Sequence, residues 1–122
     1  MKRITVLLAE DHQIVREGFR SLLKHERDIE VVGEAETGTQ AVEKYRQLKP
    51  DLVTMDIVMP DMGGIDAVRE IVKNDPDAKI LMCSAMGQQA LVVEAIQAGA
   101  KDFVVKPFQP SRVLEAVQRV LG

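Results

Sequence analysis

The stretch "ITVLLAEDHQIVREGFRSLLKH", residues 4–25, joins a short apolar run to a helical pattern through an acidic turn. Residues 4–9 are almost continuously apolar, which is typical of a strand buried on both faces. In the residues that follow, apolar side chains recur at the spacing of one helical face: Val15, Phe19, Leu22 and Leu23. The stretch therefore predicts a strand followed by an amphipathic helix.

The same alternation recurs four more times along the chain. Apolar runs predict strands at residues 30–35, 52–55, 79–84 and 102–105. Helical spacing follows each run, in residues 37–49, 64–74, 89–99 and 110–122. Five strand–helix units in succession predict a parallel sheet that is covered by helices on both faces. We therefore expect an α/β fold, a doubly wound (βα)5 sandwich, in one domain over residues 1–122.

The composition excludes several classes of protein. The chain has 122 residues, of which 46% are hydrophobic and 3% aromatic, so we expect one aliphatic core. Its net charge of −3 disfavours direct nucleic-acid binding, which needs a clustered positive surface. Cys83 is the single cysteine, and is expected to be a small core residue. The apolar runs are too short for a membrane span, so we expect a cytoplasmic protein with no membrane partner.

Polar side chains lie where the predicted strands end. Glu10 and Asp11 follow the first strand, Asp56 ends the third, Ser84 ends the fourth and Lys106 follows the fifth. Ligands of doubly wound sheets bind beyond the carboxyl ends of the strands. Each residue alone has an ordinary structural explanation, such as a turn or a helix cap, but their occurrence together at one edge favours a functional site.

The residue types at this edge suit phosphoryl transfer. Three carboxylates close in space repel one another and need a cation. With no histidine or cysteine expected among the ligands, the site would be all oxygen, which favours Mg²⁺, or Mn²⁺, over Zn²⁺. A cation, Lys106 and the hydroxyl of Ser84 around Asp56 would neutralise a phosphoryl group, and a carboxylate can be the nucleophile that accepts it.

The segments "LLAEDH", "TMDIVMPDMGG", "CSA" and "VVKPF" occur in this order, and together they resemble the response regulator receiver domain, the CheY-like family. The resemblance covers all 122 residues and implies a flavodoxin-like sheet in the strand order 2-1-3-4-5. It implies that Asp56 accepts a phosphoryl group from a histidine kinase or a small phosphodonor. It also implies that Mg²⁺ is bound by Glu10, Asp11, Asp56 and the backbone carbonyl of Val58.

The same resemblance implies a switch. Ser84 would move toward the phosphoryl group, Lys106 would contact one of its oxygens, and a cis bond is expected before Pro107. Phe103 takes the aromatic position that turns inward on activation. The surface around the fourth helix, fifth strand and fifth helix would then bind a downstream protein. Such a receiver catalyses only its own phosphorylation and dephosphorylation, and is expected to be a monomer or a weak homodimer.

Fast hydrolysis of a phosphorylated receiver needs side chains that orient an attacking water, and two positions beside the phosphoryl group are apolar in this sequence. Val58 and Met86 lie two residues after Asp56 and Ser84, at positions that flank the phosphoryl group in this family. Neither side chain can orient an attacking water, so we expect slow self-dephosphorylation.

The two halves of the chain resemble different receivers. "LLAEDHQIVREGFRSLL" with "DIEVVGEAETG" is similar to the NarL/FixJ class, which precedes a DNA-binding domain. "KILMCSAMGQQALVVEAIQAGAKDFVVKPFQPSRVLEAV" is similar to single-domain chemotaxis receivers. Natural drift, a chimera of two parents and a consensus design would each account for this mixture. The functional alternatives are a stand-alone receiver, a receiver fragment of a transcriptional regulator, and an engineered chimera with no native partner. The sequence does not identify the kinase or the target.

Three further residues have competing interpretations. His12 could touch a phosphodonor, but a solvent-exposed helix start is favoured. Leu91 and Val93 lie at the two borders of the buried face of the fourth helix. They either belong to the edge of the core or form an apolar docking surface together with Phe103.

Two other functional classes lack support in the sequence. An aspartate-based phosphatase would generally carry a second acid shortly after its nucleophile, and Val58 stands two positions after Asp56. A nucleotide or flavin binder would need a glycine-rich loop where "AEDHQ" stands.

Overall fold

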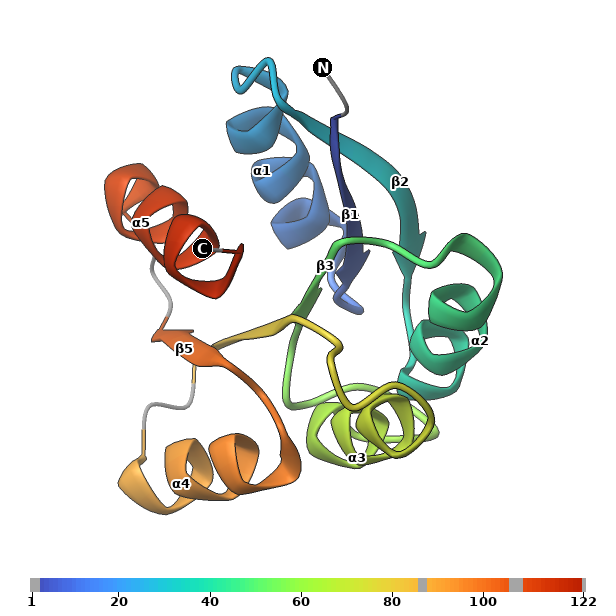
Figure 1. The fold of residues 1–122 in the computed structure, drawn as a ribbon. Helices are drawn as coiled ribbons and strands as arrows, with labels where there is room; N and C mark the ends of the chain where they lie inside the picture. The colour runs from blue at the N-terminus through green and yellow to red at the C-terminus, as the bar shows by residue number, and fades with distance from the viewer. Residues whose placement is uncertain (1–2, 86–87, 106–108, 122) are drawn as a thin grey trace.

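The computed structural model describes residues 3–85, 88–105 and 109–121, in which strands and helices alternate along the chain (Figure 1). The strands are β1 (Ile4–Ala9), β2 (Ile29–Ala35), β3 (Leu52–Met55), β4 (Ile80–Ser84) and β5 (Asp102–Val105). The helices are α1 (Gln13–Lys24), α2 (Gly38–Leu48), α3 (Gly64–Asn74), α4 (Gln89–Ala98) and α5 (Pro110–Leu121). The predicted elements are confirmed, with β2 starting one residue earlier and β4 one residue later than expected.

All strand pairs are parallel, and the sheet order is β2-β1-β3-β4-β5. The chain moves outward from β1 to the β2 edge, returns to β3 beside β1, and then proceeds to β5. The expected doubly wound, flavodoxin-like (βα)5 sandwich is therefore confirmed. Its switch point lies between β1 and β3, which is where such sheets bind ligands.

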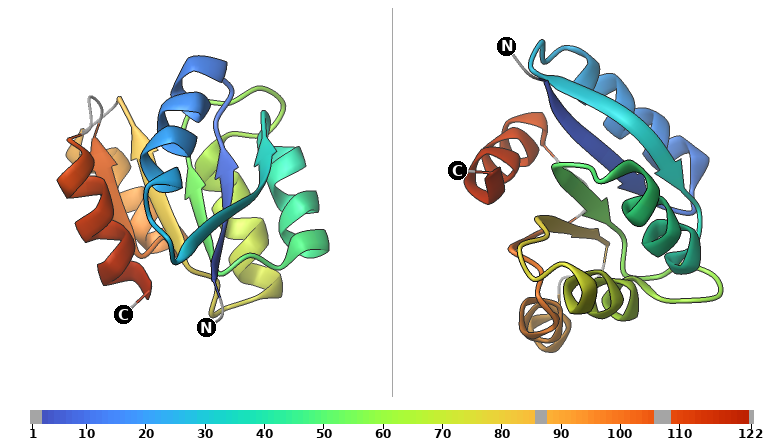
Figure 2. Two further views of the ribbon diagram at one scale, coloured as in Figure 1. Left: turned by 90° about the horizontal axis from the view of Figure 1, so that it is seen from above. Right: turned by 45° about the vertical axis from the view of Figure 1, so that its right-hand side comes forward.

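Helices cover both faces of the sheet, with α1 and α5 on one side and α2, α3 and α4 on the other (Figures 1 and 2). The side chains of β1 alternate between the two layers, since Val6 and Leu8 pack toward α1 and α5 while Leu7 and Ala9 pack on the opposite face. A strand buried on both faces must be apolar at every position, which explains the continuous run in the sequence.

The start of α3 lies against the loop that follows β3. The N–H of Gly64 donates to the carbonyl of Ile57 at 2.7 Å. A Cβ atom on Gly64 would lie 1.8 Å from the carbonyl oxygen of Asp56, so this approach requires glycine. In the described part of the chain, no helix is both long and apolar enough to cross a membrane.

Candidate functional site

Asp56 directly follows β3 and is held by the backbone on both sides. Its N–H donates to the carbonyl of Ala9 at 3.0 Å, and the N–H of Ile57 donates to its Oδ1 at 2.8 Å. Only 6% of the residue is exposed. Burial of a carboxylate is unfavourable unless charges or donors compensate it, so the surroundings of Asp56 matter.

The acidic residues after β1 lie beside Asp56. Glu10, Asp11, His12 and Asp56 each offer one ligand atom, and these atoms all lie within 4.8 Å of one another. Glu10 is buried, and its N–H donates to the carbonyl of Ala35 at 2.9 Å. The tertiary structure therefore brings together the three carboxylates that the sequence predicted, from the ends of two neighbouring strands.

The expected absence of histidine from this cluster is wrong. His12 Nδ1 lies 3.2 Å from Asp11 Oδ1 and 3.4 Å from Glu10 Oε2. The predicted exposure of His12 is confirmed, because 70% of its side chain is accessible. Both statements hold because Nδ1 lies near the carboxylates while most of the side chain stays accessible to solvent.

The electrostatics of the cluster suit a divalent cation. Burial, followed by the hydrogen bond and charge of Glu10, raises the pKa of Asp11, and His12 opposes this shift. Asp11 Oδ1 is buried and has no hydrogen-bond partner among the described residues. A buried oxygen without a donor, beside two further carboxylates, fits the oxygen-rich ligand sets of Mg²⁺ and Mn²⁺.

The other predicted site residues that the structure describes lie at the same edge of the sheet or inside it. Ser84 ends β4, is almost fully buried and pairs with Val105. Phe103 pairs with Met82 and is half-buried against the core between the sheet and α2, α3 and α4. Because side chains alternate along strands, Ser84 and Phe103 lie on the same face.

Of the remaining predicted site residues, the structure describes one and does not describe the other three. Val58 lies in the loop after β3, and its side chain is exposed. Lys106, Pro107 and Met86 lie outside the described residues.

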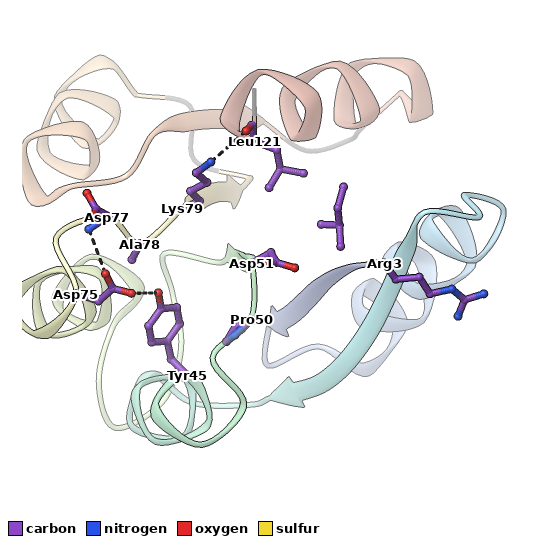
Figure 3. A pocket seen from close by; sticks show the side chains of 10 residues that line it. Arg3, Tyr45, Pro50, Asp51, Asp75, Asp77, Ala78, Lys79 and Leu121 are labelled. Carbon is purple, nitrogen blue, oxygen red and sulfur yellow. Dashed lines mark hydrogen bonds between the residues drawn. The ribbon is translucent and has the colours of Figure 1, made fainter. Parts of the chain in front are cut away.

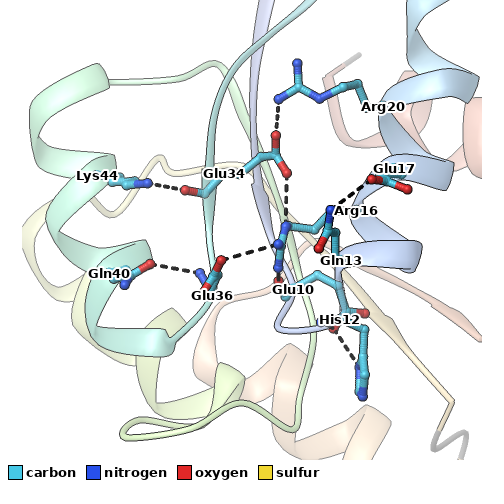
Figure 4. Close-up of polar contacts among 10 residues, drawn as sticks. All are labelled: Glu10, His12, Gln13, Arg16, Glu17, Arg20, Glu34, Glu36, Gln40 and Lys44. Carbon is cyan, nitrogen blue, oxygen red and sulfur yellow. Dashed lines mark hydrogen bonds and ion pairs between the residues drawn. The ribbon is translucent and has the colours of Figure 1, made fainter.

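Arg16 is a residue of this region that sequence analysis missed. Its guanidinium is buried behind the acidic cluster, where Nη1 donates to the backbone carbonyl of Glu10 at 2.7 Å (Figure 4). Nε donates to Glu34 at 3.0 Å and Nη2 to Glu36 at 3.3 Å. The sequence does contain a signal, because Arg16 falls on the same helical face as the buried Phe19 and Leu23. A charged residue on an apolar stripe predicts a buried ion pair.

Glu34 is the centre of this ion-pair network. It also accepts from Arg20, and its backbone carbonyl accepts from Lys44, so the network joins α1, β2 and α2. Burial alone would raise the pKa of Glu34, but the hydrogen bonds and charges of Arg20 and Arg16 outweigh burial and lower the pKa. The network thus fixes the segment carrying Glu10 from behind.

A hollow of about 500 Å³ lies at the opposite edge of the sheet (Figure 3). The Tyr45 hydroxyl donates to Asp75 at 2.6 Å, and burial together with this bond raises the pKa of Tyr45. Asp51 accepts from the Thr5 N–H at 2.8 Å, and Lys79 donates to the carbonyl of Leu121 at 3.0 Å. These polar groups hold the fold together, away from the acidic cluster.

Helix α4 and strand β5 both leave apolar side chains at the surface. Leu91 packs against the core, whereas Val93, Ile96 and Val105 are each more than two-fifths exposed. The two predicted border positions of α4 therefore differ, with Leu91 on the inner side and Val93 on the outer side. Cys83 is buried, as expected.

Comparison with known proteins identifies relatives over almost the whole chain. The family model for the response regulator receiver domain matches residues 6–118. A chemotaxis protein CheY from Thermotoga maritima is 60% identical over 115 residues, which covers 94% of this chain and 95% of that protein. This one relative aligns with both parts of the sequence, the part similar to the NarL/FixJ class and the part similar to chemotaxis receivers. The comparison therefore does not show a chimeric origin, which stays a hypothesis.

Solved structures show the same fold. The CheX-CheY-BeF3-Mg+2 complex from Borrelia burgdorferi matches with a TM-score of 0.95 and 32% identity, covering 99% of this chain and 91% of that chain. The signal receiver domain of the putative response regulator NarL from Mycobacterium tuberculosis matches with a TM-score of 0.94 and 29% identity, covering 99% and 98%. The chain therefore belongs to the family of response regulator receiver domains.

Proposed function

We propose that this two-component signal receiver accepts a phosphoryl group on Asp56, from a histidine kinase or a small phosphodonor, with Mg²⁺ or Mn²⁺ at the acidic cluster. The observation that carries the proposal is the placement of Asp56, a buried carboxylate in a group of three, at the β1–β3 switch point. The Borrelia burgdorferi relative, complexed with CheX, BeF3 and Mg+2, supports both a magnesium site and a partner protein.

The chemistry is nucleophilic attack by a carboxylate. A carboxylate oxygen of Asp56 forms a bond to phosphorus, the bond from phosphorus to the donor's nitrogen or oxygen breaks, and the leaving group takes the electron pair. A divalent cation held by Glu10, Asp11, Asp56 and the carbonyl of Val58 supplies charge neutralisation when bound. The backbone bonds to Asp56 hold its carboxylate in one orientation, so little reorganisation is needed.

The response to phosphorylation is a shift between two conformations. Ser84 and Lys106 contact the phosphoryl oxygens, and Phe103, on the same face as Ser84, moves inward. The surface of α4, β5 and α5 then changes, and a downstream protein binds there. The exposed Val93, Ile96 and Val105 give this surface the apolar character that protein partners bind. The domain acts in the cytoplasm as a monomer or weak homodimer and does not itself bind nucleic acid.

Intact mass spectrometry after incubation with acetyl phosphate and Mg²⁺ tests the proposal. We expect a gain of one phosphoryl group in the wild-type protein and none in Asp56→Asn or after chelation of the metal. Asp61→Asn is the matched control, because Asp61 lies on the same loop with a positive φ of 66° that asparagine tolerates. An equal gain in Asp56→Asn would contradict the proposal.

The decay of the same mass gain, once phosphodonor is removed, reports the phosphorylated lifetime. Val58 is exposed and apolar, so we expect a lifetime well beyond seconds. Loss of the phosphoryl group within seconds would contradict this expectation.

A further inference from the structure

The imidazole of His12 serves neither helix capping nor core packing, and its contacts are with the acidic cluster. His12 is the N-cap residue of α1, yet its side chain makes no capping hydrogen bond. With 70% of the side chain exposed, it contributes little to packing. Its Nδ1 nevertheless faces inward, within 3.4 Å of both Glu10 Oε2 and Asp11 Oδ1. The ring therefore presents a nitrogen to the same space as the carboxylates.

The distances from His12 Nδ1 to the two carboxylate oxygens suit adjacent positions in one coordination sphere. A six-coordinate ion such as Mg²⁺ holds its ligands at about 2.1 Å. Adjacent ligand atoms then lie about 3.0 Å apart and opposite ones about 4.2 Å. The distances from His12 Nδ1 to the two oxygens are 3.2 and 3.4 Å, and all four candidate atoms lie within 4.8 Å of one another. Nδ1 can thus occupy a position adjacent to Asp11 Oδ1, the buried oxygen that has no donor among the described residues.

We propose that His12 is a nitrogen ligand of the cation site, and that it raises the affinity of the site for Zn²⁺ relative to Mg²⁺. Mg²⁺ takes oxygen ligands and keeps waters, so a neighbouring imidazole adds little to its affinity. Zn²⁺ binds imidazole well. The inference rests on the proposed function, because the same carboxylates hold the ion.

Pulsed electron paramagnetic resonance of bound Mn²⁺ tests the ligand directly. A nitrogen coordinated to Mn²⁺ modulates the electron spin echo, and we expect this modulation in the wild-type protein and its loss in His12→Asn. Asparagine retains the N-cap preference, so the start of α1 is kept. His25→Asn is the matched control, because it removes the chain's other histidine, which is exposed at the far end of α1, and should leave the modulation unchanged.

Calorimetric titration with Zn²⁺ and Mg²⁺ measures the affinity for each ion. If His12 only supported the fold, its replacement would not change the ratio of the two affinities. We expect His12→Asn to weaken Zn²⁺ binding about tenfold or more, while Mg²⁺ binding changes less than about twofold. A wild-type protein that binds Mn²⁺ without nitrogen modulation, or equal Zn²⁺ affinity in His12→Asn, would overturn the role of His12 and leave the proposed function intact. Failure of the wild-type protein to bind any of these ions would overturn both.

Discussion

At the scale of single residues, Gly64 supports the backbone of Asp56. The carbonyl oxygen of Asp56 occupies the space where a Cβ atom of residue 64 would lie, and the N–H of Gly64 bonds to the next carbonyl, that of Ile57. The three atoms nearest to that Cβ position, from Asp56 and Ile57, all belong to the main chain, which cannot rotate away as a flexible side chain can. The approach of α3 therefore fixes the position of the acidic residue above it.

Replacement of Gly64 by alanine should move the Asp56 backbone. We expect Gly64→Ala to lower the free energy of unfolding by about 1–3 kcal/mol, as overpacking typically does, and to slow phosphorylation of Asp56. Urea denaturation measures the first effect and intact mass the second.

Gly18 is the matched control for this substitution. It lies within α1, and a Cβ atom there would meet nothing within 4 Å. Gly18→Ala should therefore raise the free energy of unfolding by about 0.5–1 kcal/mol, because alanine loses less backbone entropy in a helix. Equal effects of the two substitutions would contradict the close approach at Gly64.

At the scale of the elements, the ion-pair network explains how α1, β2 and α2 are held together behind the site. Arg16 reaches from α1 to Glu34 on β2 and also holds the carbonyl of Glu10. The lowered pKa of Glu34 means that the folded state favours the ionised carboxylate. This contribution to stability is therefore present above the ordinary glutamate pKa of 4.5, and is lost as the pH falls through the lower value in the folded state.

Glu34→Gln should remove part of the acid sensitivity of this protein. We expect the variant to be less stable than the wild type near neutral pH, and the difference to shrink as the pH falls below 4.5. Urea denaturation over a series of pH values measures both trends. Glu30→Gln, at an exposed position on the same strand, is the control and should follow the wild-type curve. A constant difference between Glu34→Gln and wild type at every pH would count against the network.

At the scale of the whole molecule, burial is uneven between the two helices that flank β5. Helix α5 buries Val113, Ala116, Val117 and Val120, whereas Ala95 is the buried residue of α4. Helix α4 is joined to α3 by the ion pair of Arg69 and Glu94 at 3.2 Å, and both of these side chains are about half exposed. Exposed ion pairs contribute little stability, so α4 depends on few contacts.

Hydrogen exchange should show this difference along the chain. We expect the amides of α4 to exchange faster than those of α5, because local opening of α4 exposes less apolar surface. Exchange followed by mass spectrometry of peptides from the two helices measures it. Equal protection of both helices would contradict the expectation and would weaken the proposal that α4 changes its arrangement on phosphorylation.

The sequence by itself determined the architecture and the acidic part of the site. Strands buried on both faces must be apolar throughout, and amphipathic helices must repeat their apolar residues at helical spacing, so five units could be recognised locally. Because parallel strands end at one edge, the positions of Glu10, Asp11 and Asp56 in the sequence were enough to place them together.

Only the tertiary structure decided which polar groups meet across elements. Arg16 and Glu34 are 18 residues apart, and this spacing does not predict that they form an ion pair. They meet because the fold places β2, which carries Glu34, beside β1. His12 could be assigned to the helix start, but the direction of its ring depends on the backbone turn between β1 and α1. Periodicity reports which face of an element is buried, whereas the partners of a polar side chain depend on how the elements pack in three dimensions.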